Sequence, residues 1–319
     1  METLLRNKDH IFEIKQKVEN KDPSFYTHIC LQEYTNENTE NVTLDENTIS
    51  IVMTASNRSK QVYFTLKTIS NSSYKNIQVI IVDDSDIDPI DIAYLEKEKY
   101  PFYVDLIKIK RENKNWHNPL VNYNIGFGFI QGGKVIIQNA EVCHIGDVVQ
   151  FVNNTIKADN QYYVFDVNTS RDFSTNDTIY ESNTETTEIY NQNLFELWYQ
   201  SANHNRNLHF LTSLTRKAFD KIKEFSYDYT MGSWYDDDDF LLKIKSTGLQ
   251  ITNVFHNEHH VGGIHLYHGK APDTWDKGVE MNTNLFEKKT HYYQSTGSYI
   301  DVTECIETFN DKYSSLASI

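Results

Sequence analysis

The chain has few cysteines and no long apolar run. Its 319 residues include three cysteines (Cys30, Cys143 and Cys305), which are widely separated and form no Cys-x-x-Cys pair. Such scattered thiols do not suit a disulfide framework or a zinc knuckle, so we expect a reducing compartment. No segment approaches the roughly 18 uncharged apolar residues of a membrane span. The first 22 residues are charged throughout and lack the apolar core of a signal peptide. The sequence therefore predicts a soluble cytoplasmic protein without a membrane span.

Basic residues are also scarce. The chain has 30 lysines and arginines against 45 acidic residues, a formal net charge of −15. A nonspecific nucleic-acid binder needs a basic face to meet phosphates, so we expect no nucleic-acid partner. Three motifs are missing as well: GxGxxG after the first strand, GxxxxGK[ST] and GxSxG. Their absence argues against a dinucleotide fold, a P-loop nucleotidase and a serine hydrolase.

What is present is an alternation of short apolar runs with amphipathic segments. Val62, Leu66 and Ile69 recur at spacings of four and three, which is typical of one face of a helix. Near-continuous apolar strands with helices between them indicate a parallel sheet covered on both faces, which is an α/β fold. The strands expected in the first part of the chain are 51–53, 78–82, 104–109, 134–137 and 162–167.

The second part of the chain is less regular. Residues 168–192 are rich in Thr, Asn, Asp and Glu, and this composition predicts a surface loop. The elements expected after it are a helix over 196–203, strands over 209–214 and 251–255, and a helix over 240–245 that ends at Gly248.

Polar residues follow the predicted strands. In open α/β sheets, ligands bind outside the carboxyl ends of the strands. The candidates are Thr54, Ser56 and Arg58 after the first strand, Asp83 and Asp84 after the second, and Asn139 and Glu141 after the fourth. A carboxylate at the end of the second strand could accept a hydrogen bond from the ring N–H of uracil or guanine. An equally good alternative is that the two aspartates are solvent-exposed residues where the strand passes into a loop.

The segment HNEHHVGGIHLYHG carries five histidines directly after the last predicted strand. Imidazoles at this density, with Glu258 among them, favour contact with a metal ion. The spacing matches no fixed zinc motif, so a polar loop is the alternative.

Four consecutive aspartates in GSWYDDDDF stand between aromatic residues. The combination indicates a cleft in which carboxylates meet a polar substrate or a metal ion; a charged helix start is the alternative. On a helix, residues i and i+3 share one side, so Asp236 and Asp239 should point together while Asp237 and Asp238 diverge.

The order of several motifs resembles the inverting family-two glycosyltransferases of the GT-A fold. The segments that carry the resemblance are ISIVMTASNR, VIIVDDSD, NPLVNYNIGFGFIQGGKVIIQNAEVCHIGD and HFLTSLTRKAFDKIKEFSYDYTMGSWYDDDDFLLKI. It covers residues 49–290. It implies a single GT-A domain over 47–290 with a mostly parallel, Rossmann-like sheet, divided into a nucleotide-binding half (47–167) and an acceptor half (168–290). A polar, partly helical N-terminal arm (1–46) precedes it and a C-terminal extension (291–319) follows.

The resemblance implies a nucleotide-sugar donor, with a UDP-sugar preferred. The donor-binding residues would be Thr54, Ala55, Ser56, Arg58, Asp83, Asn124 and Asn139, with Asp83 reading the base. The family usually has Asp-x-Asp where this chain has Gln138-Asn139-Ala140-Glu141. Glu141 can still ligate a hard cation, whereas Asn139 offers a neutral oxygen. A divalent ion, Mn²⁺ or Mg²⁺, is expected on Glu141, His256 and His259.

The resemblance also implies roles for the aspartates. Asp237 aligns with the general base that removes the proton from the acceptor hydroxyl, and Asp236 is the second choice. Asp238 would bind another acceptor hydroxyl. Trp234 and Tyr235 would stack on a carbohydrate acceptor, with burial in the core as their alternative.

Two rival functions remain. A sugar-nucleotide pyrophosphorylase would share the sheet but needs a glycine-rich basic loop near its N-terminus, which this sequence lacks. A GT-A module with a degraded metal motif would only bind carbohydrate or nucleotide sugar.

Overall fold

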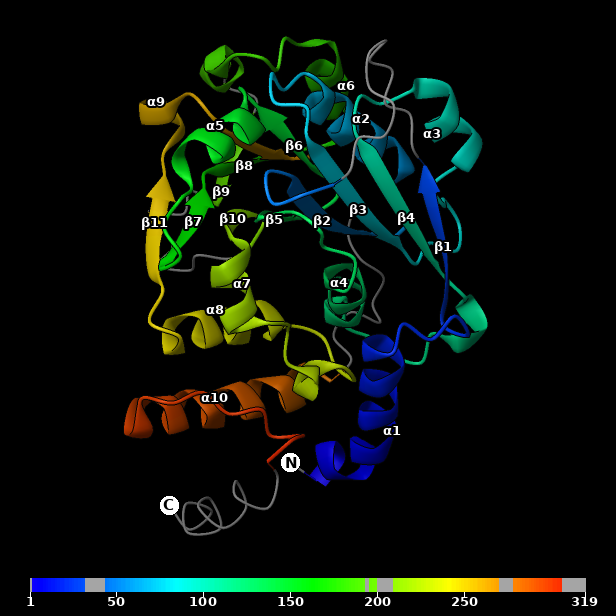
Figure 1. Cartoon of the computed structure of the whole chain (residues 1–319), viewed down its shortest axis with the longest axis vertical. Helices are drawn as coiled ribbons and strands as arrows, with labels where there is room; N and C mark the ends of the chain where they lie inside the picture. Colours follow the sequence, from blue (N-terminus) through cyan, green and yellow to red (C-terminus); the bar gives the residue numbers. More distant parts are fainter. Residues whose placement is uncertain (1, 32–43, 193–194, 200–208, 270–277, 306–319) are drawn as a thin grey trace.

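An eight-stranded mixed sheet forms the centre of the computed structural model, which describes residues 2–31, 44–192, 195–199, 209–269 and 278–305 (Figure 1). Across the sheet the strands are β1 (Tyr26–Leu31), β4 (Tyr103–Ile109), β3 (Ile77–Asp83), β2 (Ile49–Ala55), β5 (Lys134–Gln138), β10 (Leu211–Thr215), β7 (Gln161–Phe165) and β11 (Gln250–Val254). The four strands from β4 to β5 are parallel, while β1 and β10 run antiparallel to their neighbours. The expected α/β fold with a large central sheet is confirmed.

Helices cover both faces of this sheet (Figure 1). One face carries α1 (Glu2–Glu19), α4 (Leu120–Phe127), α7 (Arg216–Ile222) and α8 (Asp236–Ser246), with α10 (Val279–Thr296) packed beyond α8. The other face carries α2 (Ser59–Ser70), α3 (Ile92–Glu98) and α5 (Val148–Thr155). Shorter turns of helix are η1 (Arg111–Asn113), η3 (Tyr227–Tyr229) and α9 (His256–His259). Each face thus has its own apolar core.

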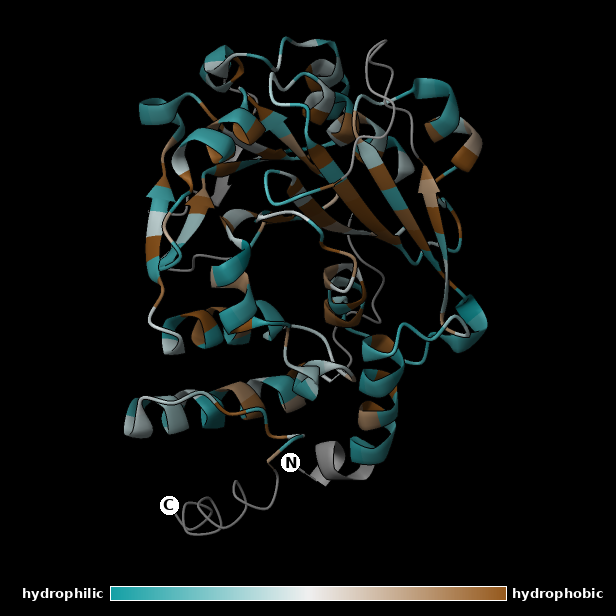
Figure 2. Ribbon diagram, viewed as in Figure 1, coloured by the Kyte–Doolittle hydropathy of each residue, from teal (hydrophilic) through white to brown (hydrophobic). Residues whose placement is uncertain are grey.

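The local sequence explains these elements. Every residue of β3 is buried, as expected for a strand covered on both faces. Val62, Leu66 and Ile69 are fully buried on one face of α2, which confirms the predicted periodicity. A Cβ added at Gly126 would lie 2.7 Å from a methyl carbon of Val52, so glycine lets α4 pack directly on β2. Figure 2 shows the apolar residues gathered in the central strands, while α9 is hydrophilic.

A second, smaller sheet lies beside the first and corrects two predictions. It contains β6 (Val142–Ile145), β12 (Gly262–His265), β8 (Val167–Ser170) and β9 (Phe195–Tyr199). The predicted loop over 168–192 holds most of β8 together with α6 (Phe173–Glu181) and η2 (Thr187–Asn191). Its polar residues serve as caps and bridges: Asp172 caps α6, and Asn176 exchanges hydrogen bonds with the backbone of Tyr267.

The helix predicted over 196–203 is also wrong where the structure describes it. Residues 195–199 form β9, which pairs antiparallel with β8, so tertiary pairing overrides the local preference. Residues 200–203 lie outside the described part of the chain.

Within residues 1–46, expected as a polar, partly helical arm, the described residues 2–31 pack on the central sheet. Ile11, Ile14 and Val18 of α1 are buried in the same core as α4. Strand β1 pairs along its whole length with β4 and forms one edge of the central sheet. Among the described helices, none combines the length and apolar character that crossing a bilayer requires.

Candidate active site

Tyr123 of α4 lies at the centre of the candidate site and is buried. Its hydroxyl donates to the carbonyl oxygen of Gln138 at 3.0 Å, lies 3.2 Å from Oδ1 of Asn139, and is also hydrogen-bonded to Thr54. Burial, and after it the charges of Glu141 and Asp237, raises the pKa of Tyr123 well above its usual range. The Tyr123 ring also lies 5.3 Å from that of His209, whose Nε2 is 3.3 Å from Asp237 of α8, so Tyr123 connects the β5–β6 turn with the start of α8.

The β5–β6 turn is held by Gln138. The Gln138 amide donates to the carbonyl of Val142 at 3.0 Å, and its Oε1 lies 2.8 Å from Nε2 of His144. Burial lowers the pKa of His144 to about 4, so the imidazole is neutral and can donate to Gln138. The first residue of the Q-N-x-E sequence thus fixes the turn that presents Asn139 and Glu141.

Glu141 is buried beneath three nitrogen-bearing side chains. Arg58 forms an ion pair with its Oε1, while Nε2 of His265 lies 3.1 Å and Nε2 of His268 3.6 Å from the same oxygen. Burial opposes the negative charge, but Arg58 and then His265 hold the pKa of Glu141 well below its usual range. Burial, with Arg58 nearby, lowers the pKa of His268 to about 4. Glu141 is therefore ionised beside a neutral His268.

These residues fit a divalent cation. Oε2 of Glu141 is buried without a hydrogen-bond partner among the described residues, so one ligand oxygen stays available. Ligand atoms of Glu141, His265 and His268 lie within 4.8 Å of one another, and in the described part of the chain they form the group suited to an ion. One carboxylate with two imidazoles is a common ligand set for divalent metals.

His256 and His259, the histidines predicted to join Glu141, have other neighbours. Nδ1 of His256 lies 3.2 Å from Oδ2 of Asp166, and its ring packs on Tyr190 at 4.3 Å. The His259 ring lies 5.3 Å from that of Phe151. Both belong to α9, whereas His265 ends β12, the strand paired with β6 beside Glu141. Strand pairing therefore selects the later histidines of the segment.

The predicted donor residues at the end of β2 and just after it have different surroundings. Thr54 is half-buried against Tyr123, Ser56 is exposed, and the carbonyl of Ala55 accepts from the backbone N–H of Asp84 at 3.0 Å. Arg58 is directed to Glu141. Thr54 thus contacts α4, Ala55 the end of the neighbouring strand and Arg58 the metal-binding group, while Ser56 stays exposed.

Asp83, the last residue of β3, and Asp84, the next residue, differ in whether a carboxylate oxygen is left without a hydrogen-bond donor. Both oxygens of Asp83 accept backbone N–H groups of its own loop, from Ser85 at 3.0 Å and Ile90 at 2.9 Å. Oδ2 of Asp84 accepts from Asn122 and Lys114, but its Oδ1 is buried with no hydrogen-bond partner among the described residues. Asp83, predicted to read the base, stabilises the loop, while Asp84 retains a free acceptor.

Two asparagines of the N-P-x-x-x-x-N-x-G segment bridge distant parts of the chain. The Asn124 side chain exchanges two hydrogen bonds with the backbone of Phe225, at 3.0 and 2.9 Å. Both the oxygen and the nitrogen of its amide are engaged there, so Asn124 is a structural bridge, and its contact with the donor stays a prediction. Asn118 donates to Oδ1 of Asp236 at 3.0 Å and to the carbonyl of Gly232 at 3.2 Å, and thereby supports the aspartate segment.

The four aspartates form the first turn of α8. Asp236 and Asp239 are buried while Asp237 and Asp238 are partly exposed, which confirms the predicted division of faces. Burial and then the charge of Asp237 raise the pKa of Asp236 to about 7. Oδ1 of Asp237 lies 3.3 Å from Nε2 of His209, whose pKa burial lowers to about 4. Asp237 is thus an accessible carboxylate next to a neutral imidazole.

The two aromatic residues before α8 lie in different environments. Trp234 is 51% exposed, whereas Tyr235 stacks on Phe286 of α10 with ring centroids 5.3 Å apart. Trp234 is therefore accessible to a ligand. Tyr235 instead packs against α10, which agrees with the alternative that it is a core residue.

Sequence reasoning did not single out five residues that the structure places in the site: Asn118, Tyr123, His209, His265 and His268. His265 and His268 belong to the histidine-rich segment after the last predicted strand, and the other three lie in segments that carry the family resemblance. Tyr123 lies in a helix whose residues are all buried, so its role is visible only through its hydroxyl contacts.

Comparisons with known proteins extend these observations. Residues 50–223, more than half of the chain, match the model of Glycosyl transferase family 2. No curated protein matches the sequence closely enough to establish a relationship.

Solved structures show more distant similarity. The chain is similar to TarS from S. aureus, with 12% identity, a TM-score of 0.47 and coverage of 69% of this chain, and it spans 37% of the TarS chain. A shorter TarS structure, residues 1–349 with UDP-GlcNAc, has the same identity and TM-score and is covered to 60%. The mannosyltransferase PcManGT from Pyrobaculum calidifontis, solved with GDP-Man and Mn²⁺, has 11% identity and a TM-score of 0.48, with 93% of this chain and 76% of that chain covered.

Proposed function

The chain belongs to glycosyl transferase family 2, and from this premise we propose that it transfers a sugar from a nucleoside diphosphate sugar to an acceptor hydroxyl with inversion. One observation carries the proposal. The buried Tyr123 lies between the two groups: its hydroxyl contacts Gln138 and Asn139 of the turn that carries Glu141, and its ring lies 5.3 Å from that of His209, whose Nε2 is 3.3 Å from Asp237. This arrangement supports a site in which the diphosphate and its cation would lie on one side of Tyr123 and a carboxylate able to take a proton on the other, as a one-step displacement requires.

The Glu141 group would hold the divalent ion. Glu141, His265 and His268 supply a carboxylate oxygen and two imidazole nitrogens. A bound cation would offset the negative charge that develops on the leaving diphosphate. Imidazole ligands suit a transition metal better than Mg²⁺, so we expect Mn²⁺. Arg58 would contribute a second positive charge on the same side of the site.

Asp84 would read the nucleobase in place of Asp83. Its unpartnered Oδ1 can accept the ring N–H of uracil, and Lys114 and Asn122 fix the other oxygen. A buried acceptor without a partner is costly unless a ligand satisfies it. Guanine also has a ring N–H, so the preference for a UDP-sugar rests on the family resemblance, and a comparison of UDP and GDP binding distinguishes the two donors.

Asp237 would be the general base. As the acceptor oxygen bonds to the anomeric carbon, the bond from that carbon to the diphosphate oxygen breaks and the hydroxyl proton passes to a carboxylate oxygen of Asp237. His209 lies 3.3 Å from Oδ1 and would orient the carboxylate. Asp236, the second choice, is buried and held by Asn118, which suits support better than contact with an acceptor.

Trp234 and Asp238 would bind the acceptor. An exposed indole beside the base offers a flat apolar surface for the ring face of a carbohydrate. Asp238, partly exposed on the next position of α8, can accept from a second hydroxyl.

A turnover assay tests this function. The protein would be incubated with UDP-sugars or GDP-sugars, Mn²⁺ and a panel of carbohydrate acceptors, while release of the nucleoside diphosphate is followed. Faster release with an acceptor than without one is expected, with the anomeric configuration of the product inverted. The rival binding module, which the neutral Asn139 favours, predicts calorimetric binding of the nucleotide sugar with no release under any condition. Retention of configuration would refute the inverting mechanism alone.

A further inference from the structure

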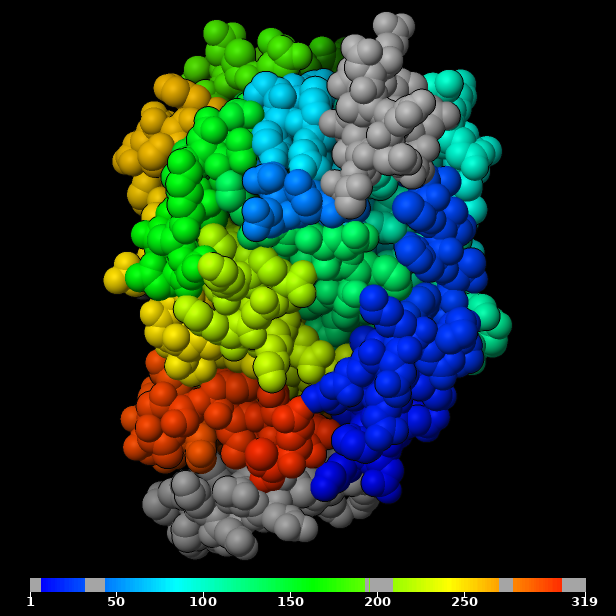
Figure 3. Space-filling view, in the orientation of Figure 1, coloured from blue at the N-terminus to red at the C-terminus, as the bar shows by residue number. Residues whose placement is uncertain are grey.

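Helix α10 lies outside the residues that match family 2 and packs along α8 (Figures 1 and 3). Asn282, Phe286 and Lys289 follow one another at spacings of four and three, so they share one face of α10. Each contacts a different part of the segment 232–239, which leads into α8 and carries the aspartates.

Asn282 holds the backbone just before α8. The side chain is fully buried, and its amide nitrogen donates to the carbonyl of Ser233 at 2.9 Å and of Trp234 at 3.1 Å. The two backbones also meet directly. A Cβ added at Gly232 would lie 2.8 Å from the carbonyl oxygen of Gly278 and 2.9 Å from Oδ1 of Asn282, so only glycine fits there.

Phe286 covers a strained turn. Trp234 and Tyr235 have φ values of 71° and 65°, which place two successive non-glycine residues in the left-handed region. Such residues persist where surrounding contacts determine them. The Phe286 ring stacks on Tyr235 at 5.3 Å, immediately after the two carbonyls that Asn282 binds. The strained turn therefore depends on α10 for its shape.

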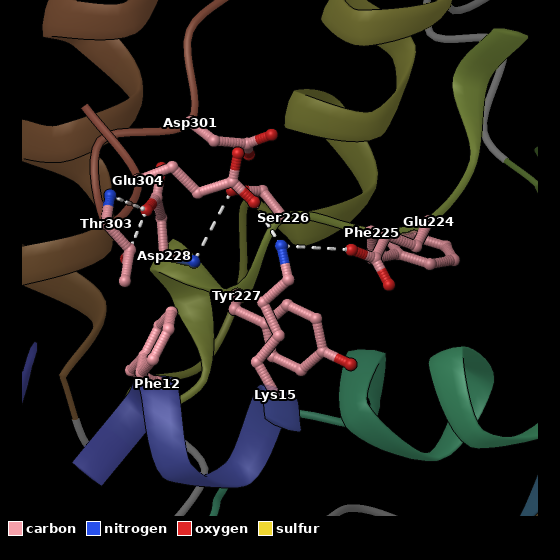
Figure 4. A pocket seen from close by; sticks show the side chains of 10 residues that line it. All are labelled: Phe12, Lys15, Glu224, Phe225, Ser226, Tyr227, Asp228, Asp301, Thr303 and Glu304. Atoms are coloured by element: carbon pink, nitrogen blue, oxygen red, sulfur yellow. Dashed lines mark hydrogen bonds and ion pairs between the residues drawn. The ribbon is translucent and has the colours of Figure 1, made fainter. Parts of the chain in front are cut away.

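Lys289 holds the other end of the aspartate run. Its ammonium is fully buried, 3.0 Å from Oδ1 of Asp239 and 2.9 Å from Oδ2 of Asp228. Burial disfavours the charge, but the two carboxylates hold the pKa of Lys289 well above its usual range. Asp228 also accepts the backbone N–H of Thr303 at 2.7 Å, which joins the C-terminal segment to the same network (Figure 4).

We propose that α10 is a clamp that positions the base, with Asn282 and Lys289 as its positioning residues. Asp237 stands between the two anchored points, three residues after Trp234 and two before Asp239. Fixing both points sets the position of the Asp237 carboxylate relative to His209 and Tyr123. The inference rests on the proposed function for its kinetic part, but the clamp itself is a property of the backbone from 232 to 240.

Two matched pairs of variants test the clamp. Asn282→Ala is compared with Asn284→Ala, an exposed asparagine on the same helix, and Lys289→Met with the exposed neighbour Lys288→Met. Amide hydrogen exchange over residues 232–240 should become faster in the first member of each pair and stay unchanged in the second. The turnover number should fall roughly ten- to hundredfold in the first members, the usual effect of a small displacement of a catalytic group. Affinity for the nucleotide should not change, because the clamp does not contact the donor side.

The outcomes separate the clamp from the proposed function. Unchanged exchange over 232–240 in Asn282→Ala overturns the clamp, whatever the activity. Parallel loss of nucleotide affinity and turnover would also overturn it, since that indicates general unfolding. If the wild type shows no transfer while the exchange effect is present, the proposed function fails and the clamp stands. If circular dichroism shows that Asn282→Ala is unfolded, the same measurements are made on Phe286→Leu, with the exposed Glu287→Ala as its control.

Discussion

The site contains two buried acidic clusters whose pKa values shift in opposite directions. Glu141 stands among Arg58, His265 and His268, and Arg58 and His265 hold its pKa well below the usual range against the effect of burial. Asp236 stands beside another carboxylate, and burial together with the charge of Asp237 raises its pKa to about 7. Burial raises the pKa of both carboxyl groups, and the charges beside each decide whether that effect is outweighed, as at Glu141, or reinforced, as at Asp236. One cluster is suited to bind a cation and the other to accept a proton.

The largest effect should come from the proton-accepting cluster. Asp237→Asn keeps the shape of the side chain and most of its hydrogen bonding but cannot take a proton. Turnover should fall by roughly two to four orders of magnitude, the usual range for loss of a general base. Steady-state kinetics measure the fall, and calorimetry with UDP should show nearly unchanged affinity.

Two neighbouring variants serve as controls for that prediction. Asp236→Asn should lower turnover less, and Asp238→Asn should chiefly raise the Michaelis constant for the acceptor. A larger loss in Asp236→Asn than in Asp237→Asn would transfer the base assignment to Asp236.

Asp236 should also make stability depend on pH. Its pKa is 3.8 in an ordinary environment and about 7 in the folded protein, so the folded state binds the proton more tightly than the unfolded chain. Its contribution to stability is therefore complete below pH 3.8 and is lost as the pH rises through about 7. A tenfold difference in proton affinity between the two states corresponds to about 1.4 kcal/mol, so the loss is at most about 4 kcal/mol. Thermal unfolding at pH 5 and pH 8 measures the part that is lost above pH 5, about 3 kcal/mol.

Asp236→Asn should reduce the difference in stability between these two pH values, while Asp238→Asn should leave it unchanged. Asp237→Asn should move the transition to lower pH, because it removes one cause of the raised pKa of Asp236. An unaltered pH dependence in Asp236→Asn would show that another group is responsible.

Metal binding distinguishes His265 and His268, which lie beside Glu141, from His256 and His259, which the sequence predicts as ligands. His268→Ala should weaken Mn²⁺ binding at least tenfold, because loss of a residue that merely hydrogen-bonds to a metal ligand already weakens binding about ten- to hundredfold. His256→Ala, the matched control, should leave Mn²⁺ affinity unchanged because its imidazole faces Asp166. Titration calorimetry or electron paramagnetic resonance with Mn²⁺ gives both values without an activity assay. The reverse order of effects would restore the histidines predicted from the sequence.

The smallest effect concerns the nucleobase. Asp84→Asn should lower UDP affinity about tenfold, the value of one hydrogen bond to a charged group. Asp83→Asn should instead lower the melting temperature, since Asp83 binds the N–H groups of Ser85 and Ile90. If Asp83→Asn alone weakens UDP binding, Asp83 reads the base, as the sequence predicts.

The site was only partly predictable from sequence. Glu141 was expected at the end of β5 because polar residues after buried strands meet at one edge of the sheet. The division of the aspartates into buried and exposed pairs followed from helical spacing. Neither pattern indicates which histidine of a dense segment reaches Glu141, because that depends on the pairing of β12 with β6 across more than a hundred residues.

The sequence by itself determined the α/β architecture, the strand ends that carry the polar residues and the turn of helix that carries four aspartates. These features depend on periodicity and on local preferences, which each segment expresses alone. Only the tertiary structure decided that Asp84 keeps an open oxygen while Asp83 does not, that Asn124 bridges to Phe225, and that α10 anchors the turn before α8. Those outcomes depend on which hydrogen-bonding groups are already engaged, and partners far apart in the chain engage them.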